Sequence, residues 1–315
     1  MALHQASGRW RRGLLLALVT AGCWATLPVA LKITLEQVDP ITLTWFRFVF
    51  AAAVIGGWLA AAGGLRQFAR LGRGGWMLLV VAAFMLIGNY IFYLLGVQHT
   101  SPANAQLLIQ LAPLLMALGG IFVFREPYRP GQWGGMAITA IGLALFFRDQ
   151  LAGNAISPHA YLLGSAAVIA AAVVWATYAL IQKQLLMRLS SPAILLAIYV
   201  TASVVLLPLS RPTALPTMDF RHALLLGYCA LNTLVAYGAF AEALEHWEAS
   251  RVSAILAVTP LLTILVVLGV HSVWPQVIAS EQVSILGFVG AGLVVAGSAL
   301  SSLLGAARKE PSDGE

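Results

Sequence analysis

Apolar residues run along this chain in long continuous stretches, and short polar segments separate one stretch from the next. Most of the stretches approach the ~20 residues that an α-helix needs to cross about 30 Å of hydrocarbon. The pattern therefore predicts an all-α integral membrane protein with ten transmembrane helices, of which the fifth and the seventh are short. The predicted spans are 13–33, 41–62, 76–97, 103–123, 132–147, 159–181, 192–209, 220–241, 250–270 and 282–304.

Composition strengthens this prediction. Of the 315 residues, 60% are hydrophobic and only 10% are charged, whereas an ordinary soluble domain has about 45–50% and about 25%. Ten spans and their short connections use nearly the whole chain, so no sizeable soluble domain remains. We therefore expect any function to lie within the membrane. Cys23 and Cys229 fall inside predicted spans, where we expect them to be small buried apolar residues.

The formal net charge of +6 is distributed in a way that indicates membrane orientation. With the N-terminus in the cytoplasm, the inner segments carry 13 of the 18 Lys and Arg residues, the outer segments carry 3, and 2 lie within spans. An excess of positive charge on cytoplasmic loops is the rule for multi-pass proteins. We therefore expect cytoplasmic N- and C-termini and no nucleic-acid partner.

One short motif occurs twice. The chain reads CWATLPVALK at 23–32 and VWATYALIQK at 174–183, so that Trp24 aligns with Trp175. Further residues keep matching spacings in the two halves, as expected for an internal repeat. The aligned pairs include Pro40 and Pro192, Tyr90 and Tyr237, Glu126 and Glu281, Gly135 and Gly290, and Gly142 and Gly297.

Each half carries five predicted spans, and five is an odd number. Equivalent helices must therefore cross the membrane in opposite directions, so the protein is expected to contain two inverted five-helix repeats. We place the first repeat at 13–147, the second at 159–304, and a cytoplasmic tail at 305–315. Halves related in this way can exchange conformations and open a midplane site to one side and then to the other, which is alternating access.

Several features together resemble the EamA-domain family of the drug/metabolite transporter superfamily. They are Arg47 early in the second span, Pro113 and Pro260 within the fourth and ninth spans, and Glu126 followed by a glycine-rich helix. The second half departs from the pattern, because Tyr199 stands where the first half has Arg47. The resemblance implies an inner-membrane carrier that needs no cofactor and commonly exports amino acids or related metabolites.

Polar side chains within the spans are the candidates for a substrate site. An unpaired polar group is costly in hydrocarbon, so each one must face a cavity or another helix. In the second case the residue bridges two helices through a hydrogen bond worth about 0.6–2 kcal/mol. The candidate substrate-binding residues are Trp24, Thr26, Asn89, Tyr93, Gln106, Gln110, Trp175, Tyr178, Asn232 and Tyr237.

Charged residues inside the spans are fewer and cost about 2.5–3.5 kcal/mol each at the bilayer centre. Arg47 is a candidate for coupling or gating, and it either lines the pathway or pairs with Glu36 or Asp39 at the outer surface. Glu242 is the candidate for a proton-binding carboxylate. Lys32 lies near a span end, where we expect it to extend toward the membrane surface.

Other functional classes fit the sequence less well. The segment EALEHWEASR at 242–251 contains one histidine, whereas a zinc peptidase needs two at i and i+4. We therefore expect no metal site and no enzymatic activity, and we expect the glycines at 135 and 142 to form a close helix-packing surface rather than a ligand loop. The sequence favours a secondary transporter that exports a small organic metabolite. An importer or a sugar-conjugate carrier of the same superfamily is the alternative, and substrate, coupling ion and oligomeric state stay open.

Overall fold

The computed structural model describes residues 9–125, 129–153, 157–247, 249–278 and 283–306, and all regular secondary structure in these ranges is helical. Most of the predicted tail at 305–315 lies outside them, as do Glu126 and Glu281. The longer helices are α1 (Trp10–Thr34), α2 (Pro40–Ala61), α3 (Arg73–His99), α4 (Pro102–Leu108), α5 (Leu111–Phe124), α6 (Pro130–Gly153), α7 (Pro158–Leu185), α8 (Ser191–Leu206), α9 (Phe220–His246), α10 (Ala249–Leu256), α11 (Thr259–Val273) and α12 (Ile285–Ala306). Short 3-10 helices η1 (Gly64–Arg70), η2 (Leu207–Leu209) and η3 (Pro212–Thr217) lie in the connections.

Within the described residues, eight helical segments are long and apolar enough to cross a membrane. They are α1, α2, α3, α4 with α5, α7, α8 with η2, α9, and α10 with α11, and α12 adds a shorter apolar stretch at Ile285–Ser301. Large apolar side chains are exposed on many helices, as expected of a surface that faces lipid. The chain is therefore a multi-pass membrane protein. The fifth predicted span falls in α6, which is not among the eight, so the count of ten stays a prediction.

Proline determines where several helices begin. It occupies the first position of α2, α4, α6 and α7, where its missing N–H has no helical acceptor to lose and its fixed φ suits the helix. Before α2, the Asp39 carboxylate accepts hydrogen bonds from the backbone N–H groups of Ile41 and Thr42, each at 3.0 Å. This N-cap satisfies two of the N–H groups that every helix start leaves without a partner.

Two of the predicted spans are broken. The fourth is divided into α4 and α5 at Ile109–Gln110, and the ninth is divided into α10 and α11 at Ala257–Val258. Pro113 and Pro260 stand in the first turn of α5 and of α11, respectively. A proline ring clashes with the carbonyl group four residues earlier and removes one helical hydrogen bond. Each proline therefore interrupts the preceding turn, and it does so at corresponding positions of the two halves.

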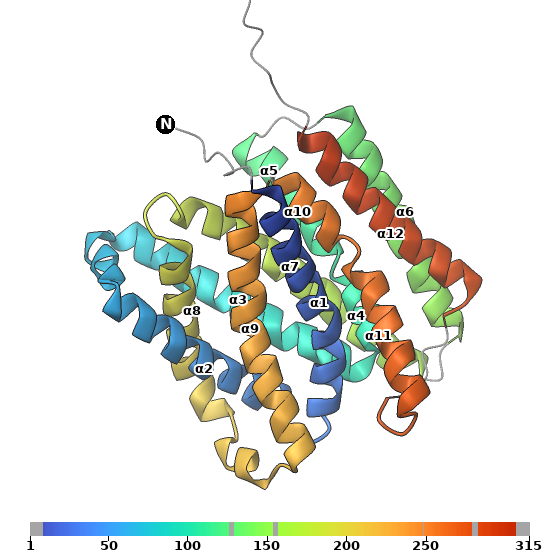
Figure 1. Cartoon of the computed structure of the whole chain (residues 1–315), viewed down its shortest axis with the longest axis horizontal. Helices are drawn as coiled ribbons and strands as arrows, with labels where there is room; N and C mark the ends of the chain where they lie inside the picture. The colour runs from blue at the N-terminus through green and yellow to red at the C-terminus, as the bar shows by residue number, and fades with distance from the viewer. Residues whose placement is uncertain (1–8, 126–128, 154–156, 248, 279–282, 307–315) are drawn as a thin grey trace, which may run out of the picture.

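The helices pack in antiparallel pairs: α1 with α9, α3 with α7, α2 with α8, and α6 with α12 (Figure 1). Contacts near both ends of the first pair show the direction, because Arg12 pairs with Glu242 while Gln37 bonds to Asp219. The pair of α6 and α12 lies at one edge of the bundle, and α2 with α8 lies toward the opposite edge (Figure 1).

Glycines bring α6 and α12 into direct backbone contact. A Cβ atom added to Gly135 would lie 2.5 Å from the backbone N of Ser301 and 2.7 Å from the carbonyl O of Gly297. A Cβ atom on Gly142 would lie 2.6 Å from the carbonyl O of Gly290. Only glycine fits at such distances, so the prediction of a close helix-packing surface at 135 and 142 is confirmed.

Candidate functional site

Arg47 lies two turns into α2, and only 3% of its surface is exposed. Its Nε and Nη2 donate to the Oγ1 of Thr233 on α9 at 3.1 and 3.0 Å. The Thr233 hydroxyl donates in turn to the carbonyl O of Cys229, so its oxygen is free to accept from the guanidinium. The guanidinium carbon also lies 4.9 Å from the ring centre of Tyr90 on α3, a cation–π contact. Residues on α3 and α9 thus hold the side chain.

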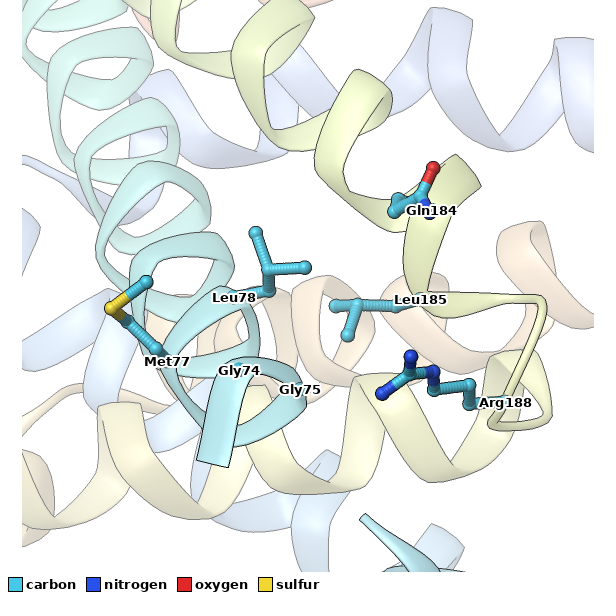
Figure 2. Close-up of a pocket in the computed structure, with 7 residues that line it drawn as sticks. All are labelled: Gly74, Gly75, Met77, Leu78, Gln184, Leu185 and Arg188. Atoms are coloured by element: carbon cyan, nitrogen blue, oxygen red, sulfur yellow. The ribbon is translucent and has the colours of Figure 1, made fainter. Parts of the chain in front are cut away.

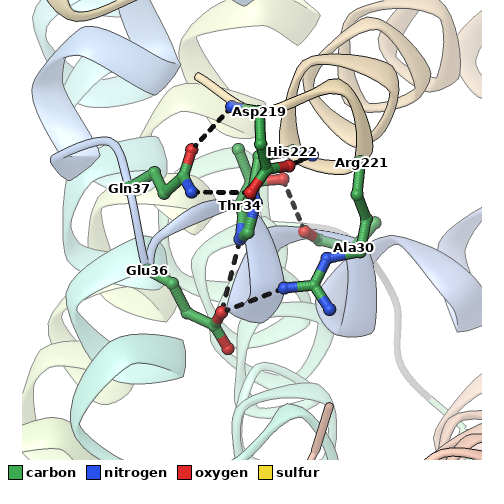
Figure 3. Close-up of polar contacts among 7 residues, drawn as sticks. All are labelled: Ala30, Thr34, Glu36, Gln37, Asp219, Arg221 and His222. Carbon is green, nitrogen blue, oxygen red and sulfur yellow. Dashed lines mark hydrogen bonds and ion pairs between the residues drawn. The ribbon is translucent and has the colours of Figure 1, made fainter. Parts of the chain in front are cut away.

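Neither carboxylate that the sequence suggested as a partner pairs with Arg47, and that expectation is wrong. The Asp39 carboxylate caps α2 instead. The Glu36 carboxylate lies 3.7 Å from Nη2 of Arg221 and 3.3 Å from Nε2 of His222 (Figure 3). In the part of the chain that the structure describes, no carboxylate forms an ion pair with Arg47. The arginine turns toward the bundle interior because both acids have closer partners at the helix ends.

Glu36 belongs to a separate polar cluster that joins the C-terminal end of α1 to the start of α9 (Figure 3). The Gln37 amide donates to the Asp219 carboxylate at 2.8 Å and accepts from the Asp219 backbone N–H at 3.2 Å. The His222 ring lies 2.7 Å from the same carboxylate. The backbone N–H of His222, and then its ring, lower the pKa of Asp219 from 3.8 to about 2.

Tyrosines from both halves gather around Arg47. Tyr90 on α3 and Tyr237 on α9 lie near one another. Tyr199 on α8 and Tyr237 are each close enough to interact electrostatically with Arg47. Tyr178 on α7 interacts in the same way with Tyr90. The cluster therefore draws on four helices besides α2.

Tyr90 and Tyr199 were not selected as site residues from the sequence, although both occupy positions that the repeat aligns with candidate residues. Tyr90 aligns with Tyr237 in the repeat, and Tyr199 aligns with Arg47. The ring of Phe48, next to Arg47 on α2, packs against both tyrosines, with centroid distances of 4.6 Å to Tyr90 and 5.1 Å to Tyr199. Correspondence between the two repeats therefore indicated the residues of this cluster better than the search for polar side chains within the spans did.

The aromatic contacts continue from Tyr237 to α1. The ring centroid of Trp24 lies 5.8 Å from that of Tyr237, in an edge-on arrangement, and 5.8 Å from that of Phe240. Trp24 and Tyr237 both retain accessible surface even though they lie between helices. Of the predicted candidates, these two are thus brought next to the Arg47 cluster.

A second group of candidates bridges α1 and α9. The Nδ2 of Asn232 donates to the carbonyl O of Cys23 at 2.8 Å and to the hydroxyl of Tyr228 at 3.1 Å, and that hydroxyl also bonds to Thr26. Asn232 is 3% exposed, and its Oδ1 accepts no hydrogen bond. A buried carbonyl oxygen without a donor is costly, so this atom is suited to receive a donor from a bound molecule.

The remaining candidates lie on α3 to α7. Tyr93 donates to Oε1 of Gln106 at 2.8 Å, which joins α3 to α4. Asn89 donates to the carbonyl O of Ala171 on α7 at 3.0 Å, so the helix-bridging alternative describes Asn89. Gln110 is half-buried at the break between α4 and α5. Trp175 packs against the same hydrophobic cluster as Tyr178. Convergence on one space near the midplane stays a prediction for Trp24, Asn89, Tyr93, Gln110, Trp175 and Asn232.

Glu242 and Lys32 have local partners. Glu242 forms an ion pair with Arg12 and lies 3.7 Å from Nε2 of His246. It stands nine residues beyond Thr233 on α9, about 13 Å along the helix at 1.5 Å per residue, and thus outside the Arg47 cluster. Lys32 donates to three carbonyl groups at the end of α3, at 2.7–2.8 Å. These carbonyl groups lack helical partners and bind the ammonium group, and the expectation that Lys32 extends toward the membrane surface stays a prediction.

A pocket of about 320 Å³ lies elsewhere, between the start of α3 and the end of α7 (Figure 2). Its walls are mostly apolar, and Gln184 and Arg188 supply the polar groups at its edge (Figure 2). None of the candidate site residues lines it. This pocket is therefore separate from the Arg47 cluster.

Comparison with known proteins shows what kind of bundle this is. A model of the EamA-like transporter family matches residues 11–148 and, a second time, residues 162–303. The chain belongs to the EamA-like transporter family. This EamA-like transporter is similar to the "uncharacterized inner membrane transporter YhbE" of Escherichia coli (strain K12), with 37% identity over 292 residues that cover 92% of this chain and 91% of the relative.

More distant relatives have names that mention substrates. A "probable amino-acid metabolite efflux pump" of Escherichia coli (strain K12) is 25% identical and covers 91% of this chain and 93% of its own length. The "aromatic amino acid exporter YddG" of Ancylobacter novellus is 30% identical over 163 residues, which cover 51% of this chain and 54% of the relative. A solved crystal structure matches with a TM-score of 0.63 and 21% identity over 95% of this chain and 98% of its own. That match shows the fold.

Proposed function

We propose that this EamA-like transporter is a secondary carrier that exports a small organic metabolite, such as an amino acid or a related compound, across the inner membrane by alternating access. The observation that carries the proposal is the Arg47 cluster, a charged and hydroxyl-rich group buried inside an otherwise apolar bundle. Intramembrane ionisable residues generally mark transport pathways. The names of the relatives support an inner-membrane location and an amino-acid substrate.

The site is formed by both proposed repeats, 13–147 and 159–304. Arg47, Tyr90 and Trp24 come from the first, whereas Tyr199 and Tyr237 come from the second. In carriers built from inverted repeats, substrate sites lie near the midplane between the repeats. Two pairs of corresponding helices pack antiparallel, α2 with α8 and α6 with α12, and this packing and the two broken helices support this organisation. Aromatic walls would enclose the apolar body of a metabolite while the amides and hydroxyls bind its polar end.

Transport into everted membrane vesicles tests the proposal. Vesicles that contain the protein should accumulate labelled amino acids from a panel, and vesicles from cells without the protein should not. A variant with Arg47→Gln should be present at the wild-type level and accumulate less. If right-side-out vesicles accumulate the substrate and everted ones do not, the protein is an importer. If no member of a broad metabolite panel moves in either orientation, the carrier proposal fails.

A further inference from the structure

Arg47 has no counter-charge in the described part of the chain, which is unusual for so deeply buried an arginine. A guanidinium offers five N–H donors in a rigid fork that matches a carboxylate. Here the fork bonds to one neutral hydroxyl, that of Thr233, through Nε and Nη2. The rest of the fork has no acceptor among the described residues.

Among the described residues, no carboxylate pairs with Arg47 to neutralise it. Tyr90, Tyr199 and Tyr237 supply ring faces and hydroxyl groups, and hydroxyl groups can donate to an anion. Burial of a charge without a partner strongly destabilises a protein, whereas a paired charge is tolerated. The arrangement is therefore suited to an anion that comes from outside the chain.

A second unpaired group lies next to Thr233 on the same helix. Asn232 Oδ1 is buried and accepts no hydrogen bond. Asn232 bonds to Cys23 on α1, whereas Thr233 bonds to Arg47 on α2, so the two groups lie on different faces of α9. The buried cation is therefore the observation that indicates an anionic ligand.

We propose that Arg47 binds the carboxylate of the transported metabolite. This inference rests on the proposed transport function and narrows the substrate class to organic carboxylates. Two charge-assisted hydrogen bonds from the free edge of the guanidinium would hold the two carboxylate oxygens. Trp24 and Tyr237, which keep accessible surface beside the cluster, would contact the body of the same molecule.

The test compares each carboxylate with its primary amide, which has nearly the same shape and lacks the negative charge. The probes are L-phenylalanine against L-phenylalaninamide, and 3-phenylpropionate against 3-phenylpropanamide, chosen because one relative is named as an exporter of aromatic amino acids. Binding is measured as the ligand-dependent rise in unfolding temperature of the purified protein in detergent. The amides should need at least about tenfold higher concentrations for the same rise, since a charge-assisted pair is lost. The second pair lacks an ammonium group and isolates the carboxylate.

Two variants at position 47 test whether Arg47 causes the preference for the carboxylate over the amide. Arg47→Gln should abolish the preference for the carboxylate, and Arg47→Lys should keep part of it, because lysine retains the charge without the fork. Arg188→Gln is the matched control, since it removes the same charge from the separate pocket between α3 and α7, so the preference should persist. If Arg47→Gln does not fold, the wild-type comparison and Arg47→Lys decide.

Wild-type protein that binds amides as tightly as carboxylates, or that binds none of the carboxylates, overturns this inference. So does a folded Arg47→Gln variant with an unchanged preference. If vesicles then transported an uncharged metabolite, the protein would still be a carrier, but Arg47 would not bind a carboxylate of its substrate. Failure of the inference and failure of the proposed function are therefore distinguishable.

Discussion

The backbone contact between α6 and α12 makes a sharp prediction about stability. A methyl group added at Gly142 would meet the carbonyl O of Gly290 at 2.6 Å and the backbone N of Val294 at 2.7 Å. Backbone atoms cannot rotate away as side chains do, so the two helices would have to separate. Gly134, on the same helix, has nothing within 4 Å of the position its Cβ would take. Gly142→Ala and Gly134→Ala therefore form a matched pair.

The expected difference in stability is what remains after the effect common to both variants is subtracted. Both exchange glycine for alanine within α6, so both gain the same helix preference, about 1 kcal/mol, and this gain cancels in the comparison. What remains is the cost of overpacking at Gly142, typically about 1–3 kcal/mol. We expect Gly142→Ala to be less stable than Gly134→Ala by that amount. Gly297→Ala and Gly292→Ala give the same comparison on α12.

Equilibrium unfolding of the purified protein in mixed micelles, with increasing SDS, measures the difference. The reasoning would be refuted if Gly142→Ala unfolded at the same SDS fraction as Gly134→Ala, or at a higher one. In that case α6 and α12 would not be in backbone contact, and the close packing predicted from the glycine spacing would be wrong.

Three further predictions concern the site, the helix ends and the orientation. Gln110→Leu should leave the protein folded and lower transport about tenfold for each ~1.4 kcal/mol of lost interaction; normal transport by a folded variant would remove Gln110 from the site. The Asp219 carboxylate has a depressed pKa, so it stabilises the contact between α1 and α9 above its ordinary pKa of 3.8 and loses this effect as the pH falls toward about 2. Hydrogen exchange in the first turn of α9 should therefore rise across that window, and it should not do so with Asp219→Asn. Reporter fusions after Arg73 should indicate the cytoplasm and those near Asp39 the outside, and the reverse result would overturn the orientation.

The helices were predictable because each depends on a property of consecutive residues. A long apolar run must be helical in lipid, since no other conformation satisfies its backbone groups. The breaks in the fourth and ninth spans follow from Pro113 and Pro260, which act on the turn before them. The helix α6 is not among the eight segments apolar enough to cross a membrane, and its glycines contact α12 directly, so its packing does not follow from apolar length alone.

The partners of the charged residues were not predictable, because they come from distant parts of the chain. The acids nearest in sequence, Glu36 and Asp39, were one of two alternatives for Arg47, whereas its partner Thr233 is 186 positions away and neutral. Lys32 lies near a span end, but its acceptors are backbone carbonyl groups of α3, to which every residue type contributes. A carbonyl group left open at a helix end leaves no signature in the sequence.

The glycine contacts also carry information about symmetry. Gly135 contacts Gly297, and Gly142 contacts Gly290. In the repeat, Gly135 is equivalent to Gly290 and Gly142 to Gly297, so exchanging equivalent residues converts the first contact into the second. A contact pattern that this exchange leaves unchanged is what a two-fold axis between the helices produces. Since α6 and α12 are antiparallel, such an axis must be perpendicular to them, and for helices that cross a bilayer it then lies in the membrane plane. This direction is the one that the proposed inverted repeat requires, and an axis along the membrane normal would have made the two helices parallel.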